Sequence, residues 1–172
     1  DFLQDRDDWL RRYDHVIYSG PIDAFFGYDQ GTLEYRSLRF ERELVNEPDV
    51  QGNAVVNYTD PDVPYTRILE HKHFDLSLRA SQSLITREYP AEWKPGQTEF
   101  YPVGSSASQA LYRRYRARAD ELAGQVTFGG RLGEYQYYDM HQVIASALTQ
   151  SRRLLTGALK PVQQPAAAAA LA

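Results

Sequence analysis

Residues that could carry chemistry are most concentrated between residues 129 and 140, which read GGRLGEYQYYDM. Glycines at the end of a strand let the backbone come close to a ligand, and Arg131 offers a forked guanidinium donor suited to phosphate. Asp139 fits the N-cap of a following helix, whose first free N–H groups would point at an anion. A glycine-rich G-x-G-x-x-G turn, the usual counterpart of such a site, does not occur in the 172 residues.

Three further charged residues, Arg36, Arg67 and Glu88, lie in segments that are otherwise apolar or aromatic. Two arginines directed at one pocket would bind a diphosphate through charge-assisted hydrogen bonds. Alternatively, each arginine is a strand-surface residue that pairs with a nearby carboxylate. Residue types and spacing leave both interpretations open.

A metal site is the other chemistry to consider, at His71 and His73. In a strand, residues i and i+2 face the same side, so the two imidazoles could share an ion. No third group of ligands accompanies them, so we expect structural hydrogen bonding and no metal. The chain has no cysteine, which excludes disulfides and thiolate metal sites and favours a reducing, cytoplasmic setting.

The overall composition is that of an ordinary globular protein, with 42% hydrophobic and 24% charged residues. The net charge of −4 argues against general nucleic-acid binding, and no apolar run approaches the ~18 residues of a membrane span. The chain contains 13 tyrosines. A tyrosine combines a ring face with a hydroxyl, which suits sugars and nucleotides, but it is also common on half-buried sheet surfaces.

Periodicity and turn residues predict helices at both ends of the chain and consecutive strands in its middle. The expected strands are residues 15–18, 33–44, 53–58, 64–74, 84–88 and 126–128, and the expected helices are residues 7–13, 22–28, 105–123 and 139–155. Short turns between the middle strands predict an antiparallel sheet. The sequence thus predicts a mixed α/β (α+β) fold, with a largely antiparallel central sheet and flanking helices.

Several of these segments, taken together and in order, resemble the C-terminal half of bacterial UDP-galactopyranose mutase. They are residues 16–23, 33–38, 51–59, 64–67, 70–74, 86–90, 101–102 and 129–140. The resemblance extends over about residues 16–147, and its specificity lies in the shared order and spacing of the segments.

The resemblance implies a flavoenzyme that interconverts UDP-galactopyranose and UDP-galactofuranose, the furanose donor for bacterial cell-wall and surface glycans. Its cofactor is FAD, which must be reduced, and the flavin N5 is thought to displace UDP and hold the sugar as an adduct while the ring opens and recloses. Covalent catalysis of this kind divides one difficult step into easier ones.

The resemblance also implies roles for individual residues. Arg67 would bind the substrate diphosphate, with Tyr101 and Tyr137 donating to the same phosphates. The implied catalytic residues are Arg36, Arg67, Glu88 and Asp139, the implied substrate-binding residues are Arg67, Tyr101, Tyr137 and Asp139, and the implied cofactor-binding residues are Ser19, Gly20, Arg36, Gly130, Arg131, Tyr138, Asp139 and Met140. The family usually has threonine at Ser19, which keeps the hydroxyl, and aspartate at His141, so His141 is assigned no role.

The same resemblance implies how the chain is organised. Residues 1–30 would be a helix–strand–helix part of an FAD-binding domain, and residues 31–104 a substrate-binding antiparallel sheet. Residues 105–157 would return to the Rossmann-like FAD-binding domain, and residues 158–172 would form a flexible tail. The implied partners are UDP-galactose and the missing N-terminal half of the protein. We therefore expect the isolated chain to be inactive, and homodimerisation is left open.

Two alternatives remain beside this interpretation. The first is a non-catalytic half-domain that binds a nucleotide sugar or a partner chain. The second is another flavoenzyme of similar architecture, such as an amine-oxidase-like protein. The phosphate-binding set implied for Arg67 and Tyr137 argues against the second, because amine substrates carry no phosphates.

Overall fold

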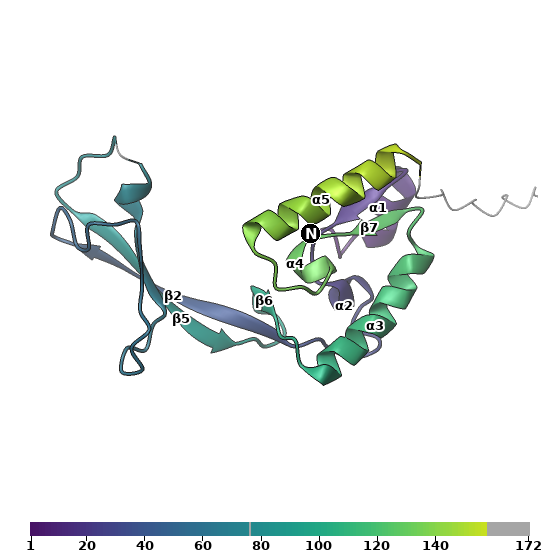
Figure 1. The fold of residues 1–172 in the computed structure, drawn as a ribbon, viewed down its shortest axis with the longest axis horizontal. Helices are drawn as coiled ribbons and strands as arrows, with labels where there is room; N and C mark the ends of the chain where they lie inside the picture. The colour runs from purple at the N-terminus through teal and green to yellow at the C-terminus, as the bar shows by residue number, and fades with distance from the viewer. Residues whose placement is uncertain (76, 158–172) are drawn as a thin grey trace, which may run out of the picture. The chain divides into compact units, whose positions relative to one another are not determined.

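The computed structural model of the chain describes residues 1–75 and 77–157 (Figure 1). The chain divides into two compact units. Unit 1 combines Asp1–Glu34 with Tyr101–Ala172, and unit 2 is the inserted segment Tyr35–Phe100. The flexible tail predicted at residues 158–172 lies outside the described residues.

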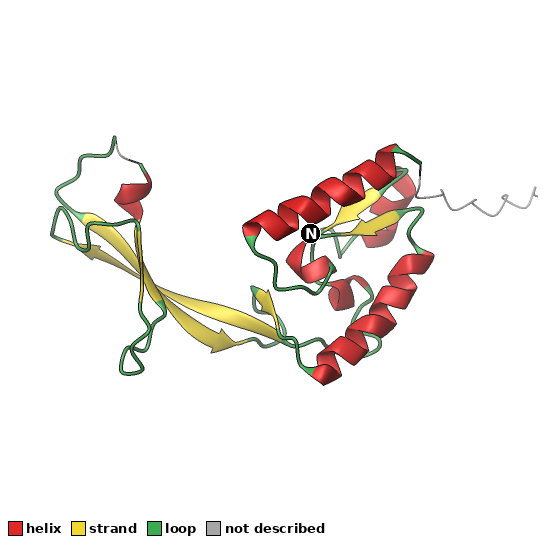
Figure 2. Cartoon of the chain, in the orientation of Figure 1, coloured by secondary structure: helices red, strands yellow, loops and turns green. Residues whose placement is uncertain are grey.

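Unit 1 consists of helices around a short parallel pair of strands (Figure 2). Its elements are α1 (Arg6–Arg12), β1 (Val16–Tyr18), α2 (Ile22–Phe25), β6 (Tyr101–Pro102), α3 (Ser106–Glu121), β7 (Val126–Phe128), α4 (Gly130–Gly133) and α5 (Met140–Leu155). Strands β1 and β7 pair in parallel, with Val16 opposite Val126 and Tyr18 opposite Phe128. Segments more than a hundred residues apart in sequence thus lie side by side.

The core of unit 1 is aromatic. Phe25 and Phe128 meet edge to face with their ring centroids 4.8 Å apart, and Tyr18 packs on both rings. Tyr115, from α3, is fully buried, and its hydroxyl donates to the carbonyl of Gly31 at 2.6 Å. This hydrogen bond ties α3 to the segment that leads into unit 2, because a buried phenol needs a polar partner.

Unit 2 is built on an antiparallel sheet, which confirms the sheet predicted for the middle of the chain. Its strands lie in the order β3 (Val55–Asn57), β4 (Arg67–Glu70), β5 (Ser83–Glu92) and β2 (Tyr35–Val45), and the 3₁₀ helix η1 (His71–Phe74) follows β4. The pairing of β2 with β5 is long and unbroken, from Arg36 opposite Glu92 to Val45 opposite Ser83.

The prediction of one strand over residues 64–74 is wrong. Strand β4 ends at Glu70, and η1 replaces its second half. His71 and His73 therefore do not share a strand face. The Nε2 atom of His71 lies 2.7 Å from Thr86 Oγ1, whereas Nε2 of His73 lies 3.3 Å from Asp49 Oδ1. The alternation of side chains expected of a strand fails here, because the backbone turns tightly at a place where the sequence has no glycine or proline to indicate a turn.

The mixed fold with an antiparallel sheet and flanking helices is confirmed, whereas a Rossmann-like domain stays a prediction. In the described part of unit 1 the only parallel pairing is that of β1 with β7. Among the described helices, none combines the length and apolarity that crossing a bilayer requires.

Candidate functional site

The segment of residues 129–140 passes close to the end of β1, and glycines make this approach possible. The N–H of Gly129 donates to the carbonyl of Tyr18 at 3.0 Å. Gly130 has a φ of +74°, and a Cβ added to Gly133 would lie 3.1 Å from the Tyr18 oxygen. Side chains at these two positions would be strained or crowded, so the glycines let α4 begin directly against the residues that follow β1.

Gly20, which follows β1, has a structural reason of its own to be glycine. A Cβ at this position would lie 2.5 Å from the hydroxyl oxygen of Tyr18, which donates to the carbonyl of Pro21. Gly20 is therefore required by the packing of a tyrosine. Its implied role in cofactor binding stays a prediction.

Arg131 lies beside a pair of tyrosines to which the family resemblance assigns phosphate binding. Its guanidinium carbon is 5.4 Å from the ring centroid of Tyr101 and 5.9 Å from that of Tyr137, and the two ring centroids are 5.2 Å apart. Its Nε donates to the carbonyl of Tyr138 at 2.7 Å, whereas its two terminal nitrogens have no hydrogen-bond partner among the described residues. We call Arg131, Tyr101 and Tyr137 the Arg131 cluster. The cluster thus contains a guanidinium that is held in place by one hydrogen bond and has further N–H groups free to donate. A phosphate group binds well to such a donor.

Tyr135, which lies between Arg131 and Tyr137 in the sequence, was not singled out by the sequence interpretation. It is buried, adopts the uncommon left-handed conformation with a φ of 48°, and its hydroxyl lies 2.6 Å from the carbonyl oxygen of Glu34 and 2.7 Å from that of Val103. Tyr137, only two residues away, is 65% exposed. The sequence offers no signal that separates these two tyrosines, because their opposite environments come from the fold.

Asp139 is the N-cap of α5, as predicted from the sequence. A capping box closes the start of the helix, with the backbone N–H of Asp139 donating to Gln142 Oε1 at 2.8 Å. The Asp139 carboxylate itself accepts a backbone N–H of the first turn, so it partly occupies the position expected for a bound anion. Met140, the next residue, is 76% exposed.

In unit 2, Arg67 and Glu88 are neighbours on adjacent strands. The Nε atom of Arg67 is 3.7 Å from Glu88 Oε1, too far for a hydrogen bond, and this buried Nε has no hydrogen-bond partner among residues 1–75 and 77–157. Glu88 is 8% exposed, and the Thr66 hydroxyl lies 3.4 Å from its Oε1. An arginine with an unpaired buried donor is unusual, because such groups normally find an acceptor.

Arg36 shares a sheet face with these two residues but lies further along it. Phe40 pairs with Glu88, and Glu88 pairs with Arg67, so the three side chains point to one side of the sheet. Arg36 is four residues from Phe40 on β2 and therefore projects from the same side, about 13 Å along the strand. The fold thus brings Arg67 and Glu88 together, with Arg36 on the same face.

Comparison with known proteins identifies the family of the chain. A family model of UDP-galactopyranose mutase matches residues 1–137. The chain belongs to the UDP-galactopyranose mutase family. The resemblance inferred from the sequence is thereby confirmed, and the matched region includes the Arg131 cluster, Arg36, Arg67 and Glu88 but ends before Tyr138.

Individual relatives in the mutase family match most of the chain. A probable UDP-galactopyranose mutase of Klebsiella pneumoniae is 40% identical over 153 residues, which cover 89% of this chain and 39% of the relative. A dTDP-fucopyranose mutase of Escherichia coli is 37% identical over 137 residues (80% of this chain, 36% of the relative). A UDP-galactopyranose mutase of Mycoplasma pneumoniae is 34% identical over 146 residues (81% and 36%). The chain therefore spans less than half the length of each of these relatives.

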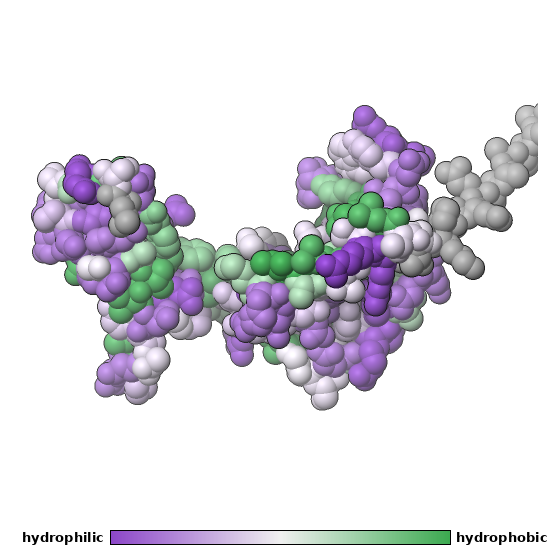
Figure 3. All heavy atoms as spheres, turned by 45° about the horizontal axis from the view of Figure 1, so that its top comes forward, coloured by the Kyte–Doolittle hydropathy of each residue, from purple (hydrophilic) through white to green (hydrophobic). Residues whose placement is uncertain are grey.

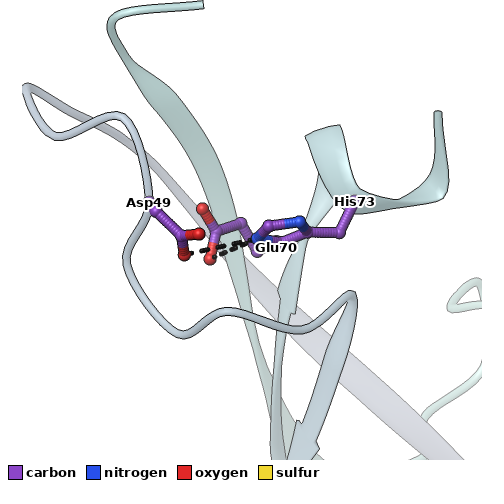
Figure 4. Close-up of side chains that lie close together, drawn as sticks. All are labelled: Asp49, Glu70 and His73. Carbon is purple, nitrogen blue, oxygen red and sulfur yellow. Dashed lines mark hydrogen bonds and ion pairs between the residues drawn. The ribbon is translucent and has the colours of Figure 1, made fainter. Parts of the chain in front are cut away.

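A separate polar cluster in unit 2 surrounds Glu70, which is fully buried (Figure 4). His73 Nε2 lies 3.4 Å from Glu70 Oε2 and 3.3 Å from Asp49 Oδ1, and the ligand atoms of these three residues lie within 4.8 Å of one another. Groups at this spacing can hold a metal. However, the Glu70 oxygens already accept hydrogen bonds from the backbone N–H groups of Val50 and Gln51 and from a serine hydroxyl. We therefore interpret the cluster as a structural ion-pair network of this mutase-family chain.

The environment of Glu70 predicts a pH dependence of stability. Burial raises the pKa of Glu70, but hydrogen bonds from Ser83, Gln51 and Val50 and the nearby charge of His73 outweigh burial, so the pKa lies below the ordinary value for a glutamate. A carboxyl whose folded pKa is depressed contributes stability above its unfolded pKa and loses it as the pH falls through the folded value.

We therefore expect the unfolding free energy of unit 2 to fall as the pH drops below about 4.3, the ordinary pKa of a glutamate in an unfolded chain. Urea unfolding between pH 3 and 7 measures this, with Trp93 fluorescence in a Trp9→Phe background reporting on unit 2. The Glu70→Gln variant should have a shallower pH slope. If its slope equals that of the parent, other carboxyls account for the dependence.

Proposed function

We propose that the chain forms part of a flavin-dependent mutase that interconverts UDP-galactopyranose and UDP-galactofuranose. Membership of the mutase family supports this reaction, which is the one named for relatives in Klebsiella and Mycoplasma. The observation that carries the proposal is the Arg131 cluster. There an arginine is oriented by a main-chain carbonyl and lies beside a pair of tyrosine rings, and its terminal nitrogens are unpaired among the described residues.

Unit 1 would supply part of the FAD site. Arg131 would donate to the pyrophosphate of the cofactor, and the backbone around Gly130 and Ser19 would lie close to it. The residues fit such a group, because the guanidinium of Arg131 is oriented by a main-chain carbonyl and its terminal nitrogens are free to donate among the described residues. When bound, the reduced flavin would supply the nucleophile that takes the sugar from UDP. Tyr138, Asp139 and Met140 would border the cofactor at the start of α5.

Unit 2 would bind and orient the substrate. The guanidinium of Arg67 would bind the diphosphate. The side chain of Arg67 supports this role, because it is 39% exposed and its Nε lies 3.7 Å from the nearest carboxylate, Glu88, so the guanidinium is partly accessible and not closely paired. The family resemblance implies Tyr101 and Tyr137, which belong to unit 1, as further donors to these phosphates. Glu88 would lie near the sugar, beside Arg67, and Arg36 would lie near both flavin and sugar. Residues 31–104 would then be the substrate-binding part, and residues 1–30 and 105–157 the cofactor-binding part.

The product would be the galactofuranose donor for cell-wall and surface glycans, made in the cytoplasm. A second sugar nucleotide is a specific alternative, because the E. coli relative, at 37% identity, is named a dTDP-fucopyranose mutase. A third interpretation is a non-catalytic half-domain that binds a nucleotide sugar or a partner chain.

One experiment separates these interpretations. In a chimera, this chain replaces the matched region of the Klebsiella relative, and flavin absorbance verifies that the chimera binds FAD. With reduced FAD, we expect conversion of UDP-galactofuranose to UDP-galactopyranose. Preferred turnover of dTDP-fucose would select the alternative substrate. A chimera that binds FAD and nucleotide sugar but turns over neither would support the non-catalytic interpretation.

The isolated 172-residue chain is expected to show no mutase activity with dithionite-reduced FAD. The reason is that its sequence lacks the glycine-rich turn that cradles the dinucleotide phosphates. The measurement is chromatographic detection of sugar-nucleotide interconversion, with the chimera as the positive control. Robust turnover by the isolated chain would contradict this part of the proposal.

A further inference from the structure

Tyr135 has an unusual backbone conformation for a buried residue. Figure 3 shows hydrophilic and hydrophobic atoms intermixed over the visible face of unit 1, so hydropathy alone does not single out a functional residue there. Among residues 1–75 and 77–157, only two residues other than glycine have a positive φ, namely Tyr28 and Tyr135. Tyr28 is exposed, whereas Tyr135 is buried. A bulky residue in this conformation is strained, and it persists only where its surroundings enforce it.

The left-handed conformation of Tyr135 belongs to the turn that ends α4. Tyr135 directly follows the C-cap of this helix, and the N–H of Gln136 donates back to the carbonyl of Arg131 at 2.9 Å. This is the longer hydrogen bond of a Schellman motif, in which glycine usually occupies the left-handed position. Because a glycine would suit the turn better than a tyrosine, the reason for Tyr135 must lie in the contacts of its side chain.

The side chain of Tyr135 joins the two segments that carry the tyrosines of the Arg131 cluster. Its hydroxyl donates to the carbonyls of Glu34 at 2.6 Å and Val103 at 2.7 Å, so one proton is shared between two acceptors. Val103 directly follows β6, which carries Tyr101, and Tyr137 is two residues beyond Tyr135. Burial raises the pKa of Tyr135, so its hydroxyl keeps its proton and remains a donor.

A second contact fixes the segment on the other side of Tyr137. The Nε of Arg131 donates to the carbonyl of Tyr138, so Tyr137 lies between two anchored residues. Its own side chain is exposed, and its ring centroid is 5.2 Å from that of Tyr101. An exposed ring has few packing contacts to hold it, so its position depends on the anchored residues on either side.

We propose that Tyr135 is a positioning residue of the phosphate site. By holding Val103 against the segment that follows α4, its hydroxyl keeps the rings of Tyr101 and Tyr137 side by side, so that both can bind the phosphates of one nucleotide sugar. The inference rests on the proposed function for the ligand of these two tyrosines. Loss of the Tyr135 hydroxyl should therefore weaken the binding of UDP, which carries the same phosphates.

The first test measures the affinity of the chimera for UDP by titration calorimetry. Tyr135→Phe keeps the ring but removes the hydroxyl, and it should weaken UDP binding about fivefold or more. Tyr115→Phe is the matched control, because it removes another buried phenol of unit 1 that donates to a main-chain carbonyl. This control should bind UDP like the parent, and FAD absorbance verifies that every variant is folded.

A double-mutant cycle separates positioning from a general structural effect. In a Tyr101→Phe/Tyr137→Phe background, Tyr135→Phe should weaken UDP binding by less than about twofold further, because residues that act through one another are not additive. A full additive loss in this background would overturn the proposal. Unchanged UDP affinity of Tyr135→Phe in the parent chimera would overturn it as well.

The second test does not depend on the proposed function. In the 172-residue chain with isotope-labelled tyrosine, a nuclear Overhauser effect between the rings of Tyr101 and Tyr137 should be present in the parent and in Tyr115→Phe. It should be weakened or lost in Tyr135→Phe, and an unchanged effect would contradict the positioning role. If Tyr101→Phe/Tyr137→Phe binds UDP like the parent chimera, the phosphate role of these tyrosines fails, and the ring contact alone decides whether Tyr135 positions them.

Discussion

Replacing Glu70 by alanine is expected to lower the unfolding free energy of unit 2 by about 3–5 kcal/mol. Glu70 has no exposed surface, and its oxygens accept from two backbone N–H groups and from Ser83. Its removal leaves these donors unpaired and takes the carboxylate away from Lys72, whose Nζ is 3.8 Å from Glu70 and whose side chain is 16% exposed. A buried charge without its partner is among the most destabilising changes that a single substitution can make.

The measurement is urea unfolding followed by Trp93 fluorescence in a Trp9→Phe background. Glu43→Ala is the matched control, because Glu43 also forms an ion pair, 2.6 Å from Arg87, but is 51% exposed. Exposed pairs contribute about 0–1 kcal/mol, so this control should remain close to the parent. If Glu70→Ala were equally mild, the network around Glu70 would not be what holds residues 49–51 to the sheet.

Replacing Arg67 by alanine in the chimera is expected to lower kcat/KM between about tenfold and 150-fold. A hydrogen bond to a charged group contributes about 1.5–3 kcal/mol, and each 1.4 kcal/mol corresponds to a factor of ten. Arg67 can make this contact because its side chain is 39% exposed and its Nε lies 3.7 Å from the nearest carboxylate, Glu88, so the guanidinium is not closely paired. The measurement is steady-state turnover of UDP-galactofuranose with reduced FAD.

Arg39→Ala controls for the loss of a positive charge from the same sheet. Arg39 precedes Phe40 on β2, so it projects from the opposite face, where it lies 4.0 Å from the Tyr89 ring centroid. Its loss should leave kcat/KM close to that of the parent chimera. The conservative Arg67→Lys should fall between, because lysine keeps the charge but not the forked geometry. Near-normal kcat/KM for Arg67→Ala would remove Arg67 from the proposed phosphate site.

Much of the local structure of unit 2 could be predicted, because it depends on neighbours in sequence. Short turns between apolar runs predicted the antiparallel sheet, and β2 and β5 exceed the predicted strands at one end or both. The exception is the region after Glu70, where η1 replaces the end of a predicted strand. That turn accompanies the contacts of Glu70 and His73 with residues 49–51, about twenty positions away, which no local pattern reveals.

The candidate site likewise combines features that depend on neighbours in sequence with features that depend on distant contacts. The sequence by itself determined the start of α5, because a capping box at Asp139 and Gln142 is made by residues three apart. The sequence also determined the family, because the order and spacing of its motifs can be compared without knowing which residues are in contact. Only the tertiary structure decided that Arg131 meets Tyr101 and that Tyr135 is buried while Tyr137 is exposed. Each of these depends on which distant surfaces pack together, and packing joins residues that the sequence keeps far apart.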